Sequence, residues 1–432
     1  MHRVKVVGAG LAGAEAAWQL AQRGVEVELY EMKPNTYSPA HESPLFAELV
    51  CSNSLRSDRL QNAVGLLKEE MRKMHSIILQ AADKTRVPAG GALSVDRHLF
   101  ATCVTDALMQ HPLIHLKRQE MAAFPEGPAI IATGPLTSDA LSCAIAQEIG
   151  AGLLSFFDAA APIVTLESID QEKTFRQSRY DRGGADYINC PMDEAQYRAF
   201  YEALMAAETA PVHGADEELN VFEGCMPVEV MAARGYQTLL FGPLKPKGIR
   251  DPKTGKMPFA NLQLRQDDAA DTLYNLVGFQ TRLTFPAQKR VFGMIPGLEK
   301  AAFARYGVMH RNTFINAPKI LNKHYRFKDG IYFAGQITGV EGYVESAASG
   351  LIAGIAMACE LTGQIVPDFS DITMLGALGR YVAAPQSNYQ PMHATYGLIR
   401  PLDERIRNKQ QRYLAMAQRS LEYIEKITAE PT

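Results

Sequence analysis

The chain has no apolar run long enough to span a bilayer, and its charges are nearly balanced. Its 432 residues carry 44 Lys and Arg against 47 Asp and Glu, which gives a formal net charge of −3. A spanning helix needs about 20 consecutive apolar residues, and a charged leader is also absent because the first residues enter a strand directly. We therefore expect a soluble, cytoplasmic protein with no membrane partner. A global basic field that would attract nucleic acid is absent as well, so any RNA contact must come from local charge.

Cysteine is scarce and scattered. The six cysteines stand at positions 51, 103, 143, 190, 225 and 359, and no Cys-x-x-Cys pair occurs. Paired spacing is typical of zinc sites and dithiol redox centres, whereas disulfide scaffolds are short and dense in cysteine. This spacing argues against zinc, so we expect no metal site. It equally argues against a disulfide framework and a dithiol oxidoreductase.

The first thirty-one residues hold the most informative pattern. An apolar strand at 4–7 runs into a glycine loop, a helix at 14–23, a second strand at 25–30 and then an acid. Such glycines let the backbone turn tightly and approach a pyrophosphate, whose charge the helix N-terminus favours. An acidic residue about 20 positions further on accepts a hydrogen bond from a ribose hydroxyl group. The alternative is a glycine turn in a non-binding α/β domain. We predict a dinucleotide site at Gly8, Ala9, Gly10, Leu11, Ala12, Gly13 and Glu31.

Two later segments are typical of flavoproteins. A strand at 129–132 ends in Thr133 and Gly134, and a second strand at 330–335 leads through a glycine loop into a small-residue helix at 343–361. In glutathione-reductase-like flavoproteins the first segment returns to FAD. The second closes the FAD site with a helix dipole that favours reduced flavin. We therefore predict FAD, with Thr133, Gly134, Gly335 and Gly342 among its contacts. A second complete fingerprint is absent, so NAD(P)H is expected to visit only transiently.

The centre of the chain changes character. Short β-like runs at 161–166, 238–241, 262–264 and 274–279 are interrupted by a helical stretch at 194–208. The first part has single helices at 63–82 and 96–110, and the α/β pattern returns near residue 330. We predict an α/β protein with a glutathione-reductase-like Rossmann FAD-binding domain. This domain is discontinuous, at 1–158 and 300–432, and an α+β domain is inserted at 159–299.

Longer stretches match a known family. They include VVGAGLAGAEAAW, FAELVCSNSLRS, FEGCMPVEV, RYGVMHRNTFIN and YFAGQITGVEGYVESAASG, and the matches extend from residue 4 to about residue 398. In these stretches the chain resembles the folate- and FAD-dependent tRNA (uracil-5-)-methyltransferases, the TrmFO family. One departure lies at 392–398, where MHATYGL stands in place of the family's MNANFGL.

The resemblance implies a reaction. 5,10-Methylenetetrahydrofolate supplies a one-carbon unit to C5 of a uridine in the tRNA T-loop. Reduced FAD supplies the reducing equivalents that turn this unit into a methyl group, and NADPH or NADH re-reduces the flavin. The implied partners are tRNA and folate, and an obligatory protein partner is not evident.

The chemistry of uracil methylation indicates which cysteines are candidate catalytic residues. A thiolate that adds to C6 of uracil makes C5 nucleophilic, and a base must later remove the C5 proton. Cys51 and Cys225 match the family and are the candidate catalytic residues, although the sequence does not say which one attacks C6. Cys190 ranks third. The remaining three cysteines lie in helical, alanine-rich segments and are expected in the core.

Substrate contacts follow with less support. His310 is placed to stack on a pterin, and Arg311 to hold a folate carboxylate, although a structural histidine beside a surface arginine is an equal alternative. Lys245 and Lys247 open a basic cluster at 245–256, and a second cluster lies at 400–412; both are candidates for phosphate contacts. Arg265 is expected to pair with Asp267 or Asp268.

Four other functions stay open. A GidA-like relative also uses FAD and folate but modifies wobble uridines, and it is longer at its C-terminus. A paralogue acts on a uracil of ribosomal RNA. A plain FAD-dependent oxidoreductase and a flavin-binding RNA chaperone are the remaining alternatives, and an assay for methylated RNA separates both from the methyltransferases.

Overall fold

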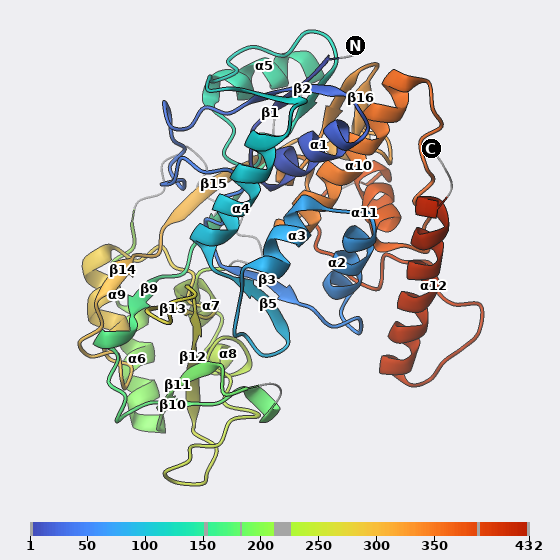
Figure 1. Cartoon of the computed structure of the whole chain (residues 1–432). Coiled ribbons are helices and arrows are strands. Elements are labelled where there is room, and N and C mark those ends of the chain that lie inside the picture. Colours follow the sequence, from blue (N-terminus) through green and yellow to red (C-terminus); the bar gives the residue numbers. More distant parts are fainter. Residues whose placement is uncertain (1–2, 151–153, 182–183, 211–225, 387–388, 430–432) are drawn as a thin grey trace.

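Two six-stranded sheets organise the molecule, and each has its own hydrophobic core (Figure 1). The computed structural model describes residues 3–150, 154–181, 184–210, 226–386 and 389–429, with only the backbone at 154–158, 310 and 311. The first sheet lies at the top of Figure 1. The second lies at the lower left, and a pair of strands connects the two regions.

The first sheet is a parallel sheet with one antiparallel edge strand. Its order is β16-β17-β7-β1-β2-β6, and only β16 among these strands runs antiparallel to its neighbour. The strands combine the two ends of the chain: β1 Arg3–Val7, β2 Glu26–Tyr30, β6 Ile114–Lys117, β7 Ala129–Ile131, β16 Arg326–Lys328 and β17 Ile331–Phe333. Buried parallel strands of this kind are apolar on both faces, which explains the valine- and isoleucine-rich segments. The predicted strands at 4–7, 25–30, 129–132 and 330–335 are confirmed.

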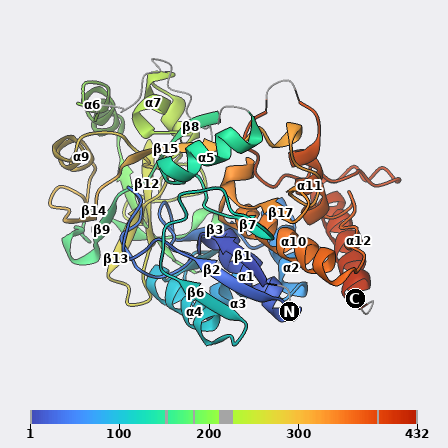
Figure 2. The same cartoon turned by 90° about the horizontal axis from the view of Figure 1, so that it is seen from above.

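Helices α1 Leu11–Gln22 and α10 Tyr343–Thr362 lie against each other beside this sheet (Figure 2). Small residues bring their backbones close together. A Cβ atom on Gly350 would lie 2.1 Å from the carbonyl oxygen of Ala12, and one on Gly354 would lie 2.8 Å from that of Ala16. The helix predicted at 343–361 is confirmed, and its small residues are explained by this close packing.

Helix α10 is also long and apolar enough to cross a membrane, by length and composition alone. It is the one such helix among the described residues. The expectation that the chain contains no apolar run long enough to span a bilayer is therefore corrected. Its residues from Val344 to Cys359 are buried inside the protein, so the composition follows from its place in the core.

The remaining helices of the first core are α2 Ala63–Lys73, α3 Ile77–Lys84, α4 Arg97–Gln110, α5 Asp139–Ile149, α11 Met374–Ala383 and α12 Lys409–Ala429. A small sheet of β3 Ser54–Ser57, β5 Ala92–Val95 and β4 Arg86–Val87 lies beside them. The single helix predicted at 63–82 is wrong. It breaks where His75 adopts a φ of 58°, and the Ser76 side chain then accepts a hydrogen bond from Leu79 N to begin α3.

The second sheet is antiparallel, in the order β10-β11-β12-β13-β9-β14. Its strands are β9 Ile163–Thr165, β10 Phe175–Arg176, β11 Tyr187–Met192, β12 Ala260–Gln266, β13 Leu273–Leu276 and β14 Phe303–Arg305. Helices α6 Glu194–Met205, α7 Val228–Ala233, α8 Thr238–Phe241 and α9 Phe285–Phe292 accompany it. The β-like run predicted at 238–241 is wrong, because these residues form the short helix α8.

Strands β8 Leu154–Ala159 and β15 Met309–Phe314 form an antiparallel pair between the two regions. Two cores joined by this pair support the proposed division into a discontinuous first domain and an inserted second one. The second sheet continues to Arg305 in β14. The boundary that we propose therefore lies after Arg305 rather than at 299, and the division itself stays a prediction.

Candidate functional site

A cleft of about 1090 Å³ opens at the carboxyl ends of the first sheet's parallel strands. Ligands of open α/β sheets bind in this position. The cleft is lined by predicted contacts from three distant segments: Gly8, Gly10, Leu11, Ala12, Glu31, Thr133, Gly134 and Gly335. The structure therefore brings together most of the residues that the sequence assigned to the cofactor.

The three glycines of the first loop have different tasks. Gly8 has a φ of +95°, and a Cβ atom there would lie 2.8 Å from the carbonyl oxygen of Ala132. A Cβ atom on Gly13 would lie 1.8 Å from the carbonyl oxygen of Gly8, so Gly13 allows the helix to pack on the strand. A Cβ atom on Gly10 would meet no described protein atom within 4 Å, although Gly10 lines the cleft. The empty space at Gly10 is therefore available to a ligand.

The N-terminus of α1 is open toward the cleft. Its N-cap is Gly10, which offers no side-chain hydrogen bond, and no acidic residue stands in the first turn of this described helix. Unpaired backbone N–H groups and the positive end of the helix dipole are thus left for an anion. This arrangement suits a pyrophosphate.

Glu31 lies where a ribose would be held. One carboxylate oxygen accepts a hydrogen bond from Ala9 N at 2.9 Å, and the other accepts one from Lys33 N at 3.0 Å. These two bonds fix the carboxylate at the mouth of the loop. Each oxygen has a further lone pair for a hydroxyl group, so the geometry agrees with the predicted role of Glu31. Ala9 itself contributes its N–H to Glu31 and does not line the cleft.

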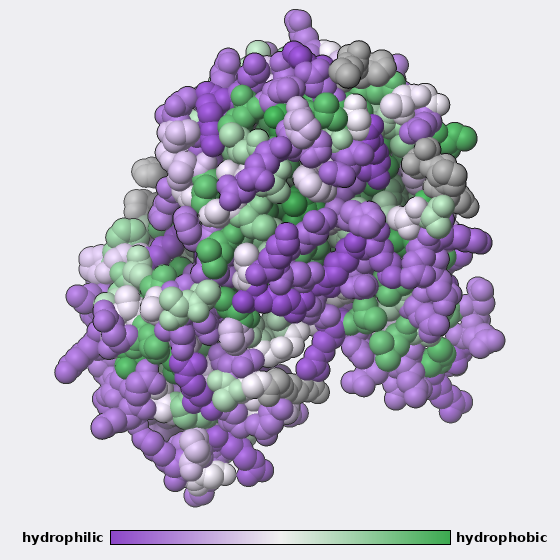
Figure 3. Space-filling view, viewed as in Figure 1, coloured by the Kyte–Doolittle hydropathy of each residue, from purple (hydrophilic) through white to green (hydrophobic). Residues whose placement is uncertain are grey.

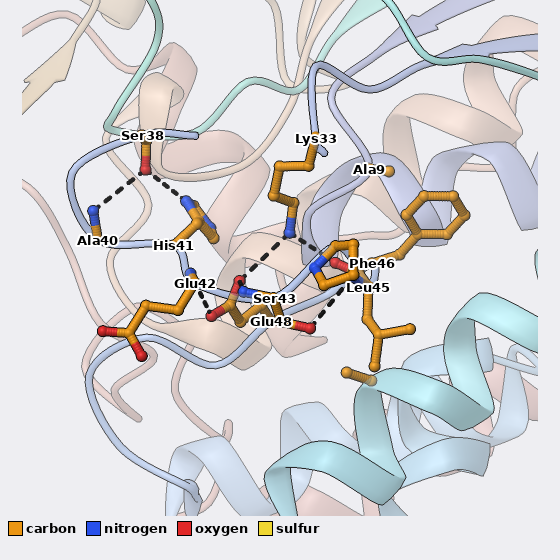
Figure 4. A network of polar contacts seen from close by, with 12 residues as sticks. Ala9, Lys33, Ser38, Ala40, His41, Glu42, Ser43, Leu45, Phe46 and Glu48 are labelled. Carbon is orange, nitrogen blue, oxygen red and sulfur yellow. Dashed lines mark hydrogen bonds and ion pairs between the residues drawn. The ribbon is translucent and has the colours of Figure 1, made fainter. Parts of the chain in front are cut away.

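A loop at 32–48 borders the same end of the cleft (Figure 4). Buried Lys33 donates to the carbonyl oxygen of Leu45 at 2.6 Å and lies 3.4 Å from a carboxylate oxygen of Glu48. Glu48 also accepts from the backbone N–H groups of Glu42 and Ser43. The loop is therefore closed by its own side chains, which gives the cleft a fixed wall.

His41 belongs to that wall. It forms a 2.6 Å hydrogen bond with Ser38 Oγ, and both residues line the cleft (Figure 4). Burial lowers the pKa of His41 below its usual value, and the charge of Lys33 lowers it further. A neutral imidazole is thus favoured beside the cofactor cleft.

The opposite wall comes from the C-terminal part of the chain. Gly335, Gln336, Tyr343 and Ser346 line the cleft, so the first turn of α10 faces it, as the sequence indicated. Gly342 does not line it. A Cβ atom on Gly342 would lie 2.6 Å from a carboxylate oxygen of Glu345 and 2.9 Å from Arg56 Nη2. A glycine at this position leaves room for the ion pair between Arg56 and Glu345.

Cys51 lies directly behind this wall. Its backbone N–H donates to the hydroxyl oxygen of Tyr343 at 2.7 Å, and Ser52 N donates to the same oxygen at 3.1 Å. The half-buried thiol is 3.7 Å from the carbonyl oxygen of Ala159. Val50 and Tyr343 both line the cleft. Cys51 therefore neighbours the cofactor cleft, and its catalytic role stays a prediction.

Comparison with known proteins shows the family of this chain. The model of the family described as glucose inhibited division protein A matches residues 3–365. The chain is 57% identical over 425 residues to methylenetetrahydrofolate–tRNA-(uracil-5-)-methyltransferase TrmFO of Bacillus cytotoxicus, with 98% of both chains covered. It is 56% identical over 434 residues to the TrmFO of Lactobacillus gasseri, covering 100% of this chain and 99% of that one.

The chain belongs to the TrmFO family. The resemblance seen in the sequence is thereby confirmed over the whole chain. The solved structure of Aquifex aeolicus GidA in its form II crystal superposes with a TM-score of 0.67 at 15% identity, covering 99% of this chain and 76% of that chain. This likeness confirms the α/β fold class with its Rossmann-type domain.

The residues of the cleft fit the FAD expected of a TrmFO family member. The space at Gly10, the open N-terminus of α1 and the fixed carboxylate of Glu31 correspond to pyrophosphate and ribose. The first turn of α10 closes the other end. Among the described residues, no group of three His, Cys, Asp or Glu side chains is placed to hold a metal ion.

Several predicted residues cannot be placed by their side chains. Cys225 lies outside the described residues. The backbone of His310 and Arg311 lies in β15, opposite Asp158 and Phe157, but their side chains are outside the described part. The predicted roles of these three residues stay predictions.

The other cysteines separate clearly by burial. Burial raises the pKa of the Cys190 thiol far above its usual value, so it is a poor source of thiolate. Cys359 is buried as expected, whereas Cys103 is half-buried. Cys143 is exposed, so its expected place in the core is wrong.

Lys245 and Lys247 lie away from the cleft. Their carbonyl oxygens accept hydrogen bonds from Arg179 at 2.5 and 3.1 Å, which fixes the start of the basic cluster at 245–256. This segment belongs to the second region, at the lower left of Figure 1. It forms no part of the wall around the first sheet.

The segment at 392–398 packs on the loop that closes the cleft. Met392 forms a parallel bridge with Val340, and His393 Nδ1 lies 2.7 Å from the carbonyl oxygen of Glu341. Ala394 N donates to a carboxylate oxygen of Glu345 at 2.8 Å. The departure from the family pattern at His393 therefore lies beside Glu341, in the loop that precedes α10.

Sequence reasoning missed the residues that support Cys51. Arg97 donates to the carbonyl oxygen of Leu49 at 2.7 Å and pairs with Asp267 at 3.0 Å. Arg265 hydrogen-bonds Ser52 Oγ and Asn53 Oδ1, so its expected pairing with Asp267 or Asp268 is wrong. No local spacing pointed to these contacts, because the partners of Arg97 and Arg265 lie more than 40 positions away along the chain.

Proposed function

We propose that this chain transfers a one-carbon unit from 5,10-methylenetetrahydrofolate to C5 of a T-loop uridine in tRNA, and that it acts in the cytoplasm. The observation that carries the proposal is identity of 56–57% along nearly the whole chain with proteins named for this reaction. The cleft supports it, because its residues fit the flavin that the reaction requires. When bound, reduced FAD supplies the reducing equivalents that turn the methylene group into a methyl group, and NAD(P)H restores them.

The protein's own contribution begins with a thiolate. Attack of a cysteine sulfur on C6 of uracil forms a C–S bond and makes C5 an enolate-like nucleophile. C5 then forms a bond to the methylene carbon of folate. A base removes the C5 proton, the bond between the methylene carbon and the folate nitrogen breaks, and tetrahydrofolate leaves. Once the methylene group has been reduced to a methyl group, the C–S bond breaks and releases the cysteine. We assign these tasks to Cys51 and Cys225 together, and the order between them is left to experiment.

Substrate contacts complete the proposal. His310 and Arg311 are assigned to folate. Lys245 and Lys247, with the rest of the cluster at 245–256, are assigned to the tRNA backbone. Figure 3 shows a notch, largely bordered by hydrophilic residues, between the lower-left and lower-right parts of the molecule. The second sheet and its helices form the lower-left part, and α12 lies in the lower-right part (Figure 1). We assign to this notch an RNA that contacts both basic clusters, and we propose no obligatory protein partner.

The test is a reconstitution of the reaction. The purified holoenzyme is incubated with an unmodified tRNA transcript, methylenetetrahydrofolate and NADPH or NADH, and the digested RNA is analysed for 5-methyluridine. We expect product in the T-loop that requires folate. Cys51→Ala and Cys225→Ala should retain flavin but lose product, while Cys143→Ala, an exposed cysteine, serves as the matched control. Product at a wobble uridine or only in ribosomal RNA would instead establish one of the alternative substrates.

A further inference from the structure

Three aromatic rings form a stack at the surface of the second region. The ring of Tyr306 stacks on those of Phe303 and Phe285, with centroid distances of 4.9 and 4.6 Å and interplanar angles of 6° and 14°. Phe303 lies in β14 and packs against the second hydrophobic core. Phe285 begins α9 and is 51% exposed. Both elements lie at the left of Figure 1 and Figure 2. The stack is therefore anchored at Phe303 and open to solvent at Phe285.

A buried glutamine of α9 fixes the backbone beside this stack. The side-chain nitrogen of Gln288 donates to the carbonyl oxygens of Leu283 and Gly307 at 2.7 and 2.8 Å. Its oxygen accepts a hydrogen bond from Gly307 N at 2.8 Å. A Cβ atom on Gly307 would lie 2.7 Å from the carbonyl oxygen of Ala160, so the chain after Tyr306 is packed closely on both sides. A ring that is already held in place loses little freedom when a ligand stacks on it.

The exposed ring lies a short way along the chain from the surroundings of Cys51. Thr281 N donates to the carbonyl oxygen of Ala160 at 3.4 Å. The Cys51 thiol is 3.7 Å from the carbonyl oxygen of the preceding residue, Ala159. The four steps from Thr281 to Phe285 span at most about 14 Å, and one nucleotide of a stacked strand spans about 3.4 Å. A few nucleotides of RNA can therefore reach from Cys51 to the ring of Phe285.

The charge beside the exposed ring suits a nucleic acid. Lys289 follows Phe285 by four positions, so the two exposed side chains share one face of α9. The sequence of α9 contains no acidic residue. The neighbouring Arg290 is paired with Glu208 at 2.9 Å, whereas Lys289 has no ion-pair partner in the part of the chain that the structure describes. An open aromatic ring with an available cation beside it can bind a base and a phosphate of the same strand.

We propose that the exposed ring of Phe285 is a stacking platform for one nucleobase of the RNA close to the target uridine, and that Lys289 contacts a neighbouring phosphate. Stacking accepts any base, because every base has a π-face, so the platform positions the strand without reading its sequence. The inference rests on the function proposed above, since it takes an RNA substrate. It adds a contact outside the basic clusters at 245–256 and 400–412.

The test measures the binding of a fluorescently labelled, unmodified tRNA transcript to the holoenzyme by anisotropy, without folate, so that no turnover occurs. In Phe285→Ala we expect the dissociation constant to rise about 10- to 100-fold, as for the loss of one stacked base. Phe285→Leu keeps an apolar side chain without a ring and should bind as weakly. Phe285→Trp keeps a ring and should bind like the unchanged protein. Normal binding by Phe285→Leu would overturn the proposal.

The salt dependence of binding separates the ring from the cation. Lys289→Ala removes one phosphate contact, so the slope of the logarithm of affinity against the logarithm of salt concentration should become shallower by about one. Phe285→Ala should weaken binding at every salt concentration and leave this slope unchanged. A changed slope in Phe285→Ala would show that the substitution acts through charge and not through stacking, which contradicts the platform.

Phe241→Ala is the matched control. Phe241 in α8 is also an exposed phenylalanine of the second region, at 78%, and it is not part of the stack. We expect its tRNA affinity to equal that of the unchanged protein, and flavin absorbance and circular dichroism to be the same in all variants. An equal loss of affinity in both alanine variants would overturn the proposal. So would an altered oligomeric state of Phe285→Ala in sedimentation velocity, because the ring would then contact another copy of the chain. If Phe285→Ala does not fold, the comparison of Phe285→Leu with Phe285→Trp decides.

Failure of this inference can be told apart from failure of the proposed function. If the unchanged protein methylates the tRNA and Phe285→Ala binds it as tightly, only the inference fails. If the unchanged protein binds no tRNA, the proposed function fails and the inference fails with it. If it binds tRNA and forms no 5-methyluridine, the proposed reaction is wrong, and the affinities of the Phe285 variants still decide whether the ring is a platform.

Discussion

The two sheets of this chain differ in the residues that hold them to their neighbours. Beside the first sheet, glycine and alanine residues let the backbones of α1 and α10 approach closely, and glycines shape the loop at the cleft. In the second sheet, β12 is buried along its whole length although it contains Asn261, Gln263 and Arg265. The cofactor cleft of the first region therefore depends on close backbone packing, whereas the second sheet contains a network of buried polar side chains.

Asn189 is the centre of that network. Its amide nitrogen donates to the carbonyl oxygen of Gln177 at 2.9 Å, and its oxygen accepts from Asn261 and Gln263 at 2.9 and 3.2 Å. Buried amides are tolerated only where they are paired. The comparison teaches that close backbone packing shapes the cofactor cleft, whereas the second region uses buried polar side chains, of which Arg265 hydrogen-bonds Ser52 and Asn53 in the Cys51 loop. Four predictions probe this difference, from the largest expected effect to the smallest.

Gly13→Val should be the most damaging change. The new Cβ atom would lie 1.8 Å from the carbonyl oxygen of Gly8, so helix and strand must separate. We expect a loss of about 3 kcal/mol or more in the free energy of unfolding, measured by denaturant titration of the flavin-free protein. Stability equal to that of the unchanged protein would show that α1 does not pack on β1 in this way.

Gly10→Val should damage binding rather than folding. A Cβ atom at Gly10 meets no described protein atom within 4 Å, so the fold is retained, but the side chain fills the space of the pyrophosphate. We expect FAD affinity to fall by about 100-fold, or roughly 3 kcal/mol, measured by flavin titration. Gly10→Ala is the milder control. Undiminished affinity in Gly10→Val would place the pyrophosphate elsewhere.

Asn189→Leu should destabilise the second region alone. It leaves the amide groups of Asn261 and Gln263 without their acceptor in a buried site, at a cost of about 2 kcal/mol. Denaturant unfolding followed by tyrosine fluorescence measures this, and flavin content should not change. The exposed Asn35, which donates to the carbonyl oxygen of Arg118, provides the control Asn35→Leu. An equal effect in both variants would contradict a special role for the network.

Glu70→Gln should alter the pH dependence of stability. Glu70 is buried in the first core, where it accepts hydrogen bonds from Met374 N and Leu375 N, and burial raises its pKa to about 7. A raised pKa means that the stabilising contribution is full below pH 4.5 and is lost as the pH rises through about 7. The unchanged protein should therefore lose about 1–2 kcal/mol between about pH 5 and pH 7 from this group.

The measurement is urea unfolding at several pH values in that window. Glu70→Gln should flatten the slope, while Glu69→Gln, on the outer side of the same helix with a side chain 35% exposed, should leave it as it is. Glu15 is likewise buried with a pKa raised to about 7, so a residual slope remains. An identical slope in Glu70→Gln and the unchanged protein would contradict the assignment.

Local patterns predicted the strands and helices that short-range chemistry specifies. The fingerprint from Gly8 to Glu31 and the small-residue helix α10 were found because turn geometry and close packing restrict the residue types along a continuous segment. The break at His75 and the helix α8 were missed. At His75 a left-handed residue was not visible in the apolar spacing, and α8 is too short for periodicity to separate a helix from a strand.

The amino-acid sequence by itself determined the cofactor loop, the α/β class and the family, because each depends on residues that are close along the chain or on long matching stretches. Only the tertiary structure decided what surrounds Cys51. Tyr343 lies 292 positions from Cys51 along the chain, and Arg265 lies 213 positions from Ser52. Partners at such separations leave no period or spacing in the sequence, since the folding of two regions against each other is what brings them together.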